Sequence, residues 1–249
     1  MSYAFDFSGF DMYAGMLARG VGVTLGLTAV STVLGGLVGI AGAGISIGGP
    51  RWSRAVVAAY VELIRNTPFI VQLFFIFFGL PGLGIHIDEV SAAILAMTVN
   101  LGAYATEIVR AGIDSIPRGQ VQAAMALGLH GRQVFRHVVL PQAIANVFPA
   151  LLSQVLIVML GSAVVSQISV PDLTYAANFI QSRNFRSFES YLIITATYLF
   201  LSIALRQVIN RLGARLFAGR MPHSASAPRG LFRILSAWRT ARALPSERS

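Results

Sequence analysis

Residues 119–141 read GQVQAAMALGLHGRQVFRHVVLP, and they lie in a polar, arginine-containing loop that is long for a connection between helices. Residues 120–127 are good helix formers, and Gly128 is placed to end that helix in a left-handed turn. Residues 131–139 predict a second short helix, which stops before Pro141 because the residue before a proline avoids the helical conformation. The loop therefore predicts an exposed helix–turn–helix, although an ordinary amphipathic loop fits the same pattern.

The chain on both sides of this loop is strongly apolar. Of its 249 residues, 12% are charged and 55% are apolar, against about 25% and 45–50% in soluble domains, and its mean hydropathy is +0.68. A bilayer core of roughly 30 Å requires about 20 apolar residues per helix, and these runs do not alternate as barrel strands do. We predict an all-α integral membrane protein with five transmembrane helices at 20–48, 55–80, 87–109, 147–168 and 189–210.

Two small-residue features predict how the spans are shaped. Glycine pairs four residues apart let helices approach closely, and we expect one of the three pairs in the first span to mark such a contact. Pro68 is expected to kink the second span or to begin its deep part. The glycine pairs are Gly22/Gly26, Gly35/Gly39 and Gly44/Gly48.

The arginines predict the orientation, because cytoplasmic loops of membrane proteins collect basic residues. Arginines follow the first span, cluster between the third and fourth, and follow the fifth. Placing the N-terminus outside and the C-terminus in the cytoplasm satisfies every loop except 169–188, which is mildly basic. The chain then divides into an extracytoplasmic N-terminal segment, a transmembrane domain with a long cytoplasmic loop, and a basic cytoplasmic tail: 1–19, 20–218 with loop 110–146, and 219–249.

Several function classes are excluded by residue types that the chain lacks. It has no cysteine and no lysine, so its 19 basic residues are all arginine. An ATP-binding P-loop needs a lysine on the phosphates, so any ATP that drives the protein is bound by a partner. The four histidines have no metal-ligand spacing, and no nucleophile–base arrangement or pair of catalytic carboxylates is apparent. We expect no catalytic residue, no metal site and no nucleic-acid partner.

The loop resembles the EAA loop of permease subunits in binding-protein-dependent ABC importers. The family pattern is Glu-Ala-Ala, three residues, Gly, nine residues, an aliphatic residue, any residue and Leu-Pro, and every spacing matches. The matching residues are Gln122, Ala123, Ala124, Gly128, Val138, Leu140 and Pro141. Flanking segments resemble the polar amino-acid branch, which includes histidine, glutamine, glutamate, arginine and opine permeases, and the resemblance covers about residues 15–217. These segments are Tyr60–Pro68, Val71–Phe74, Gly102–Gln120 and Val170–Leu173.

The resemblance implies a type I ABC importer permease fold in a bacterial inner membrane. Two permease chains, identical or related, would frame one pathway for a polar amino acid, which an extracytoplasmic solute-binding protein delivers. A cytoplasmic ATPase dimer would bind ATP and magnesium, hold the EAA loops in surface clefts and drive alternating access. Coupling to that ATPase falls on Gln122, Ala123, Ala124, Gly128, Leu140 and Pro141.

The chain departs from the family pattern at two places. Gln122 replaces the usual glutamate, so it keeps the size but cannot form a charge-assisted pair with a cleft arginine. Residues 160–163 read LGSA, where family members often carry Lys-Asp-Thr-Ser, so both charges are missing there. The second departure fits a pair of permeases that differ from each other, but the sequence leaves open whether the pair is homomeric.

Polar residues inside the spans are candidate pathway or substrate residues, because such groups need partners in lipid. The candidates are Glu62, Arg65, Asn100, Gln154 and Ser162. Glu62 and Arg65 could instead form a mutual ion pair near the cytoplasmic interface. Asn100, Gln154 and Ser162 could instead hydrogen-bond neighbouring helices.

Three rival functions remain at this point. A secondary transporter or channel would be supported by inverted repeats, which we do not find, and a membrane enzyme would need a reactive constellation. The same permease fold could serve another solute, such as an osmolyte or a metal ion. In the tail, Leu231, Phe232, Leu235 and Trp238 share one helical face, which is typical of a helix lying on the inner leaflet; a disordered basic tail is the alternative.

Overall fold

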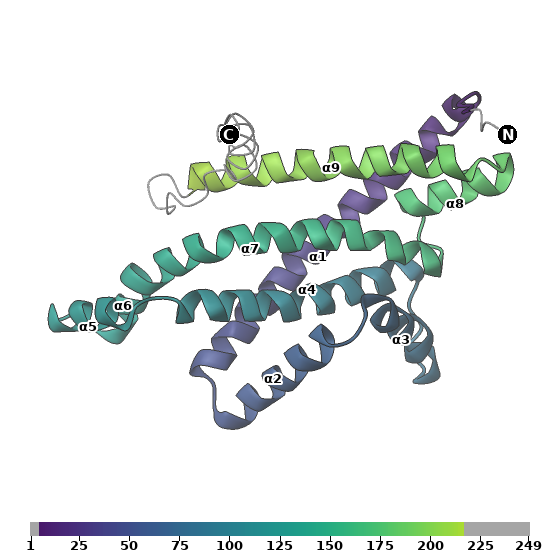
Figure 1. Cartoon of the computed structure of the whole chain (residues 1–249). Helices are drawn as coiled ribbons and strands as arrows, with labels where there is room; N and C mark the ends of the chain where they lie inside the picture. The colour runs from purple at the N-terminus through teal and green to yellow at the C-terminus, as the bar shows by residue number, and fades with distance from the viewer. Residues whose placement is uncertain (1–4, 217–249) are drawn as a thin grey trace, which may run out of the picture.

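The computed structural model describes residues 5–216, and within that range the chain is built from helices and short connections (Figure 1). The predicted tail, 219–249, lies outside the described residues. The elements are η1 (Phe10–Tyr13), α1 (Ala14–Gly48), α2 (Arg51–Arg65), α3 (Phe69–Gly82), α4 (Glu89–Asp114), α5 (Arg118–Ala126), α6 (Gly131–Val134), η2 (Phe135–Val139), α7 (Leu140–Gly161), η3 (Ser162–Ile168), α8 (Leu173–Asn184) and α9 (Ser187–Leu216).

Four helical stretches of the described chain are long and apolar enough to cross a membrane, and a fifth is added if the bent pair α2–α3 counts as one span. The prediction of an all-helical protein with several spans is therefore confirmed. The four stretches are Phe10–Gly48, Glu89–Asp114, Gly131–Ile168 and Ser187–Arg215.

The second predicted span, 55–80, is not one continuous helix. It consists of α2 and α3, whose axes are bent by 107°. The break follows from Pro68, which is the N-cap of α3 and has no amide hydrogen to continue the ladder of α2. The kink expected at Pro68 is confirmed, and the span consists of two helices.

Helix α1 packs against α4 through a stripe of glycines. A methyl group on Gly35 would lie 2.9 Å from Leu101, and one on Gly39 or Gly42 would collide with α4 as well. The glycines of the other two predicted pairs face open space. The expected close contact is thus confirmed for Gly35/Gly39, and it holds α1 against α4, which lines part of the cavity described below.

The short helix α8 is fastened to both α1 and α9. The carboxylate of Asp172 accepts a hydrogen bond from the Tyr175 amide at 2.8 Å, and the Tyr198 hydroxyl lies 3.3 Å from its other oxygen. The Leu173 amide donates to the Thr24 hydroxyl on α1. Asp172 is fully buried, and this burial raises the pKa of its carboxyl to about 6.

The N-terminal segment is tied to the turn before α9. Arg186 pairs with the Asp6 carboxylate at 2.5 Å and also donates to the Asp6 carbonyl. Hydrogen bonds from Ser8, together with Arg186, lower the pKa of Asp6 to about 2.

The molecule is elongated, and its connections gather at two opposite ends (Figure 1). Helices α5 and α6 and the turn between α1 and α2 lie toward one end, which we call the α5 end. Helix α8 and the start of the chain lie at the other, which we call the α8 end. The arginine-rich connections of the sequence fall at the α5 end, as one side of a membrane requires.

Candidate functional site

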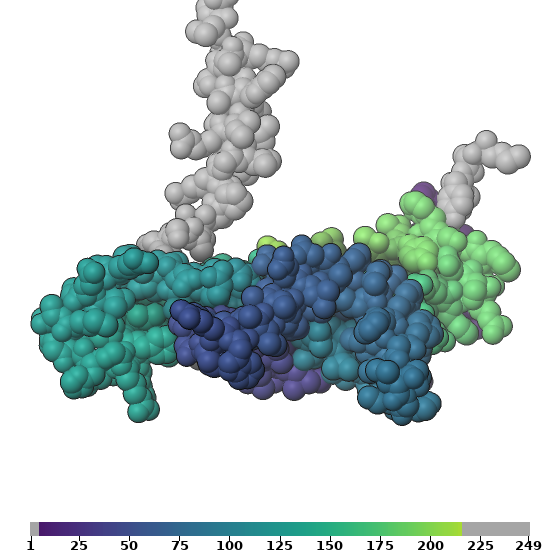
Figure 2. All heavy atoms as spheres, turned by 90° about the horizontal axis from the view of Figure 1, so that it is seen from below, coloured from purple at the N-terminus to yellow at the C-terminus, as the bar shows by residue number. Residues whose placement is uncertain are grey.

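The predicted helix–turn–helix projects at the α5 end, where Figure 2 shows it in teal. Its first helix is α5, and Gly128 has the left-handed conformation expected of it, with φ of 83°. Ile116, Ala124, Val134 and Val139 form a small buried cluster that holds the two arms together. The segment is therefore a folded unit with its own core.

The second helix of this unit does not stop before Pro141. It runs from α6 through η2, a π-helical turn, and into α7, where Pro141 occupies the second position. A proline is tolerated in the first turn of a helix, and the wider turn at η2 immediately precedes it. The consequence is mechanical, because the tip of the loop is continuous with a membrane-crossing helix.

The residues of the EAA-like motif divide into two groups. Ala124 is buried in the loop's own cluster, whereas Gln122, Ala123 and Gly128 are exposed; Leu140 and Pro141 are half-buried at the start of α7. The motif thus supplies both an internal anchor and an outward face.

Sequence reasoning missed the apolar tip of this loop. Leu127 is 83% exposed, and Met125 and Phe135 are also exposed on the same unit. Large apolar side chains at such exposure are typical of a contact surface. For Leu127, its position next to Gly128 was the signal that could have found it, since a turn glycine places its neighbours at the tip.

Two side-chain bridges fix the loop to the transmembrane helices. The side-chain amide of Gln142 on α7 donates to the side-chain oxygen Oε1 of Gln120 at 2.6 Å, and the Asn146 side-chain amide donates to the Ser115 hydroxyl at 3.1 Å. Both bridges join the segment around α5 to α7. A displacement of α5 therefore acts on α7 through side chains as well as through the backbone.

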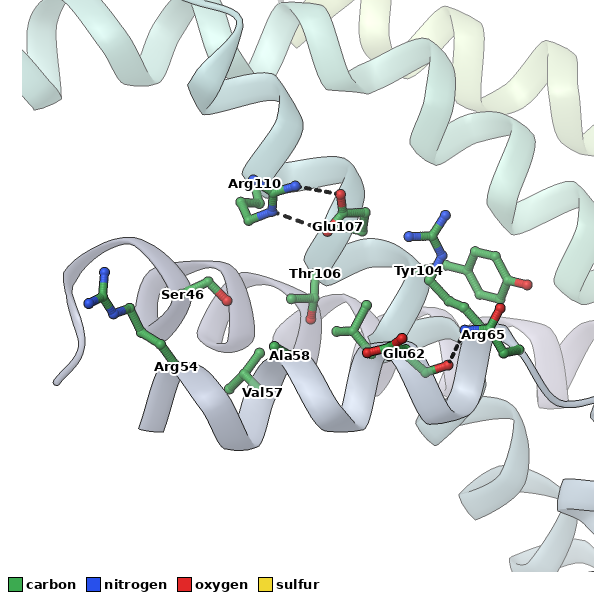
Figure 3. A pocket seen from close by; sticks show the side chains of 12 residues that line it. Ser46, Arg54, Val57, Ala58, Glu62, Arg65, Tyr104, Thr106, Glu107 and Arg110 are labelled. Carbon is green, nitrogen blue, oxygen red and sulfur yellow. Dashed lines mark hydrogen bonds and ion pairs between the residues drawn. The ribbon is translucent and has the colours of Figure 1, made fainter. Parts of the chain in front are cut away.

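A cavity of about 620 Å³ lies between α2, the end of α1 and α4 (Figure 3). Its charged lining consists of Arg54, Glu62, Arg65, Glu107 and Arg110. Val57, Ala58 and Val61 of α2 supply an apolar strip, and Ser46, Asn66 and Thr106 supply small polar groups. Two of the five predicted pathway residues, Glu62 and Arg65, thus face one cavity.

The ion pairs inside this cavity do not include the one that was considered between Glu62 and Arg65. Glu107 and Arg110 form a two-bonded pair, at 2.6 and 3.1 Å, and Arg110 also binds Asp114. Glu62 and Arg65 do not pair with each other; the Arg65 guanidinium lies over the Tyr104 ring, 5.5 Å from its centroid. Among residues 5–216, Glu62 has no ion-pair partner, so the mutual pair considered for Glu62 and Arg65 is absent.

Asn100 lies at the sharp corner between α2 and α3. Its side-chain amide donates to the side-chain oxygen Oε1 of Gln72 at 2.9 Å. The side-chain Nε2 of Gln72 in turn donates to the backbone carbonyls of Ile64 and Thr67 and to the Thr67 hydroxyl. Asn100 also lines a cavity of only about 70 Å³, together with Phe69 and residues of α7. The hydrogen bond to a neighbouring helix that was expected of Asn100 is therefore present, and its contact with a pathway stays a prediction.

The two remaining candidates lie outside both of these cavities. Ser162 is fully buried and donates to the Met159 carbonyl within its own helix at 2.7 Å. Gln154 is 7% exposed, and its amide makes no hydrogen bond to any residue from 5 to 216. Within that range no group of three or more His, Asp or Glu side chains could hold a metal ion.

Comparisons with known proteins agree on one kind of protein. Residues 16–218 match the family described as the inner membrane component of binding-protein-dependent transport systems. The probable glutamine ABC transporter permease protein GlnM of Bacillus subtilis (strain 168) is 37% identical over 64% of this chain and 73% of its own length. The glutamine transport system permease protein GlnP of Escherichia coli (strain K12) is 32% identical over 85% of this chain and 98% of its own length.

A solved structure extends the likeness to the fold. One chain of an amino acid ABC transporter crystallised with histidines superposes with a TM-score of 0.80 and 35% identity. The match covers 86% of this chain and all of the other. The bent α2–α3 pair and the projecting α5–α6 loop therefore belong to an architecture that is found in a known transporter.

Proposed function

Because the chain belongs to the family of inner membrane components of binding-protein-dependent transport systems, we propose that it forms half of the pathway through which an ATP-driven importer carries a polar amino acid. The chain is a multi-pass permease subunit and not an enzyme. Relatives named for glutamine transport, and the transporter solved with histidines, support an amino acid as the substrate.

The observation that carries the coupling role is the exposed apolar tip of a rigid loop. Leu127, Met125 and Phe135 present apolar surface beside the exposed Gln122 and Ala123, and the loop's own core keeps that surface in one shape. A short helix of this kind fits a groove on a partner protein. The partner is a cytoplasmic ATPase dimer that binds ATP and magnesium.

The remaining partners follow from this assignment. With the α5 end in the cytoplasm, the α8 end faces outside, in a bacterial inner membrane, and receives substrate from a solute-binding protein. A second permease chain, identical or related, completes the pathway. The continuity of α6, η2 and α7 supports transmission, because a helix moves as one body when its end is displaced.

Within the membrane, the corner at Asn100 is the best-supported part of the substrate path. Its amide lines the small cavity, and Gln154 on α7 keeps an amide without a described partner. The cavity of about 70 Å³ is too small for an amino acid, because ligand sites usually exceed about 300 Å³. The path is therefore closed at this level, and opening it requires movement of α3 or α7. Ser162, which bonds its own helix, is the weakest of the five candidates.

Purification from the native membrane in mild detergent tests the proposal directly. Mass spectrometry of stoichiometric companions should find an ATPase with a P-loop lysine, and proteoliposomes of the complex with the binding protein should take up a labelled polar amino acid when ATP is present. A chain that purifies without any ATPase, under conditions that preserve known ABC complexes, contradicts the coupling role. Uptake that proceeds without ATP favours a stand-alone transporter.

A further inference from the structure

We infer that the cavity between α2 and α4 is a second binding site, one that holds a zwitterionic α-amino acid at the α5 end of the pathway. The inference rests on the proposed function, in which the α5 end faces the cytoplasm. The site would be occupied by substrate that has already passed the Asn100 corner, or by the same amino acid from the cytoplasm.

The cavity has room for such a ligand and the Asn100 cavity does not. Its volume of about 620 Å³ lies in the usual range for small-molecule sites, about 300–1,000 Å³. The other cavity, at about 70 Å³, has room for a few water molecules. In this conformation an amino acid therefore fits at the α5 end and not at the corner.

Of the charged residues that line the cavity, Arg54, Glu62 and Arg65 have no ion-pair partner among residues 5–216, so charges of both signs are free to bind a zwitterion. Within residues 5–216 the Glu62 carboxylate has no ion-pair partner, and Arg65, three residues later on the same face of α2, is turned toward the Tyr104 ring (Figure 3). The two opposite charges line the same cavity and form no ion pair with each other. The α-ammonium group of an amino acid could pair with the Glu62 carboxylate, and its α-carboxylate could pair with Arg65. A carboxylate accepts bidentate hydrogen bonds from a guanidinium.

The rest of the lining suits a variable side chain. Val57 and Ala58 offer an apolar strip, and Asn66, whose side-chain amide nitrogen donates to the Glu62 backbone carbonyl at 2.8 Å, adds a polar group to the lining. Glu107 and Arg110 already satisfy each other, so they close one wall of the cavity without offering a free charge. A ligand that carries only negative charge, such as phosphate, would be repelled by the Glu62 carboxylate when bound to Arg65, which favours a zwitterion.

Gln72 links the helix that carries this site to the Asn100 corner. Gln72 accepts from Asn100 and donates to Ile64 and Thr67, at the end of the helix that bears Glu62 and Arg65. The two cavities share no lining residue. The Gln72 hydrogen bonds thus connect the end of α2 to Asn100 of α4.

Calorimetric titration of the complex, purified in detergent without its binding protein, tests the site. The probes are L-glutamine, L-arginine, L-histidine and L-glutamate, each also as its N-acetyl derivative and its α-amide. For at least one amino acid, we expect N-acetylation and amidation each to weaken binding by about 5-fold, the upper range for exposed ion pairs.

Variants then assign each charge to its residue. In Glu62→Gln the penalty for N-acetylation should disappear, and in Arg65→Gln the penalty for amidation should disappear. Glu89→Gln, which removes a carboxylate from the first turn of α4 at the opposite end of that helix, should keep both penalties. A merely structural role for Glu62 would weaken all three forms of the probe equally, and that result overturns the inference, as does the absence of binding by all four amino acids.

Uptake measurements keep the two proposals separate. If proteoliposomes import one of these amino acids but Glu62→Gln leaves the N-acetyl penalty intact, the import function stands and the second site is wrong. If the penalties behave as expected but no amino acid is imported, the site stands and the proposed import function fails.

Discussion

Replacing Gly128 tests how much of the coupling depends on the shape of one turn. Gly128 has φ of 83°, and a methyl group added there would meet nothing within 4 Å. Gly119 on the neighbouring helix also has open space around it but has no positive φ. The two glycines therefore differ in backbone conformation and not in room, so a substitution at each isolates the conformational cost.

The magnitude follows from that difference. An L-residue in the left-handed region costs roughly 1–2 kcal/mol, which corresponds to about a 5- to 30-fold fall in the equilibrium constant between the native turn and its alternatives. Gly128→Ala should accordingly lower ATP-dependent uptake by about 5-fold or more, whereas Gly119→Ala should keep the wild-type rate. Gly128→Asn should fall between them, because asparagine visits the left-handed region more readily.

The assay compares uptake by proteoliposomes with ATP hydrolysis and with the melting temperature of the purified complex. The turn lies at the surface, so the melting temperature should change little while uptake falls. Equal uptake by Gly128→Ala and Gly119→Ala would refute the reasoning, because it would mean that the left-handed turn is not needed at the ATPase. A parallel fall in stability and uptake would instead indicate a folding defect.

Three further substitutions test other parts of the structure. Gly39→Ala should lower the melting temperature of the chain, because overpacking against α4 costs about 1–3 kcal/mol, whereas Gly36→Ala, whose methyl meets nothing within 4 Å, should not. Burial raises the pKa of the Asp172 carboxyl from 3.8 to about 6. The stability that the protonated carboxyl contributes is therefore complete below about pH 4 and is lost as the pH rises through 6. The melting temperature should rise on acidification from pH 7.5 to pH 5, and Asp172→Asn should abolish that rise. Gln142→Ala, which removes the bridge to Gln120, should reduce uptake without changing the melting temperature, and unchanged uptake would show that the backbone of α7 alone transmits the motion.

Much of the fold could be predicted because it depends on local signals. Runs of apolar residues located the spans, and Gly128 located the left-handed turn. The close approach of α1 and α4 was predicted as one of three glycine pairs, but the sequence could not say which pair, since that depends on the rotation of α1 against its neighbour. The structure selects Gly35/Gly39 because Leu101 and Ala105 of α4 lie opposite them, too close for a side chain on either glycine.

The errors have a common physical cause, which is competition between local and tertiary effects. Pro141 predicted the end of a helix, yet the helix continues through it, because a π turn precedes the proline and places it in a first helical turn. At Pro68 the predicted kink is present, as a bend of 107° between α2 and α3. A proline thus marks a place where the backbone ladder is interrupted, and the surrounding packing decides whether the chain bends or continues.

The candidate site shows the same division between what is contiguous and what is assembled. The coupling motif could be recognised in the sequence because its residues lie in one short loop, and the structure adds the exposed Leu127 that spacing alone does not reveal. The larger cavity is assembled from α1, α2 and α4, so no spacing in the sequence describes it. The spacing of Glu62 and Arg65 on α2 would allow an ion pair between them. The pair does not form, and the Arg65 guanidinium lies over the Tyr104 ring of α4 instead. A carboxylate left unpaired by an interaction across helices is a property of the fold, and it is where a ligand can compete.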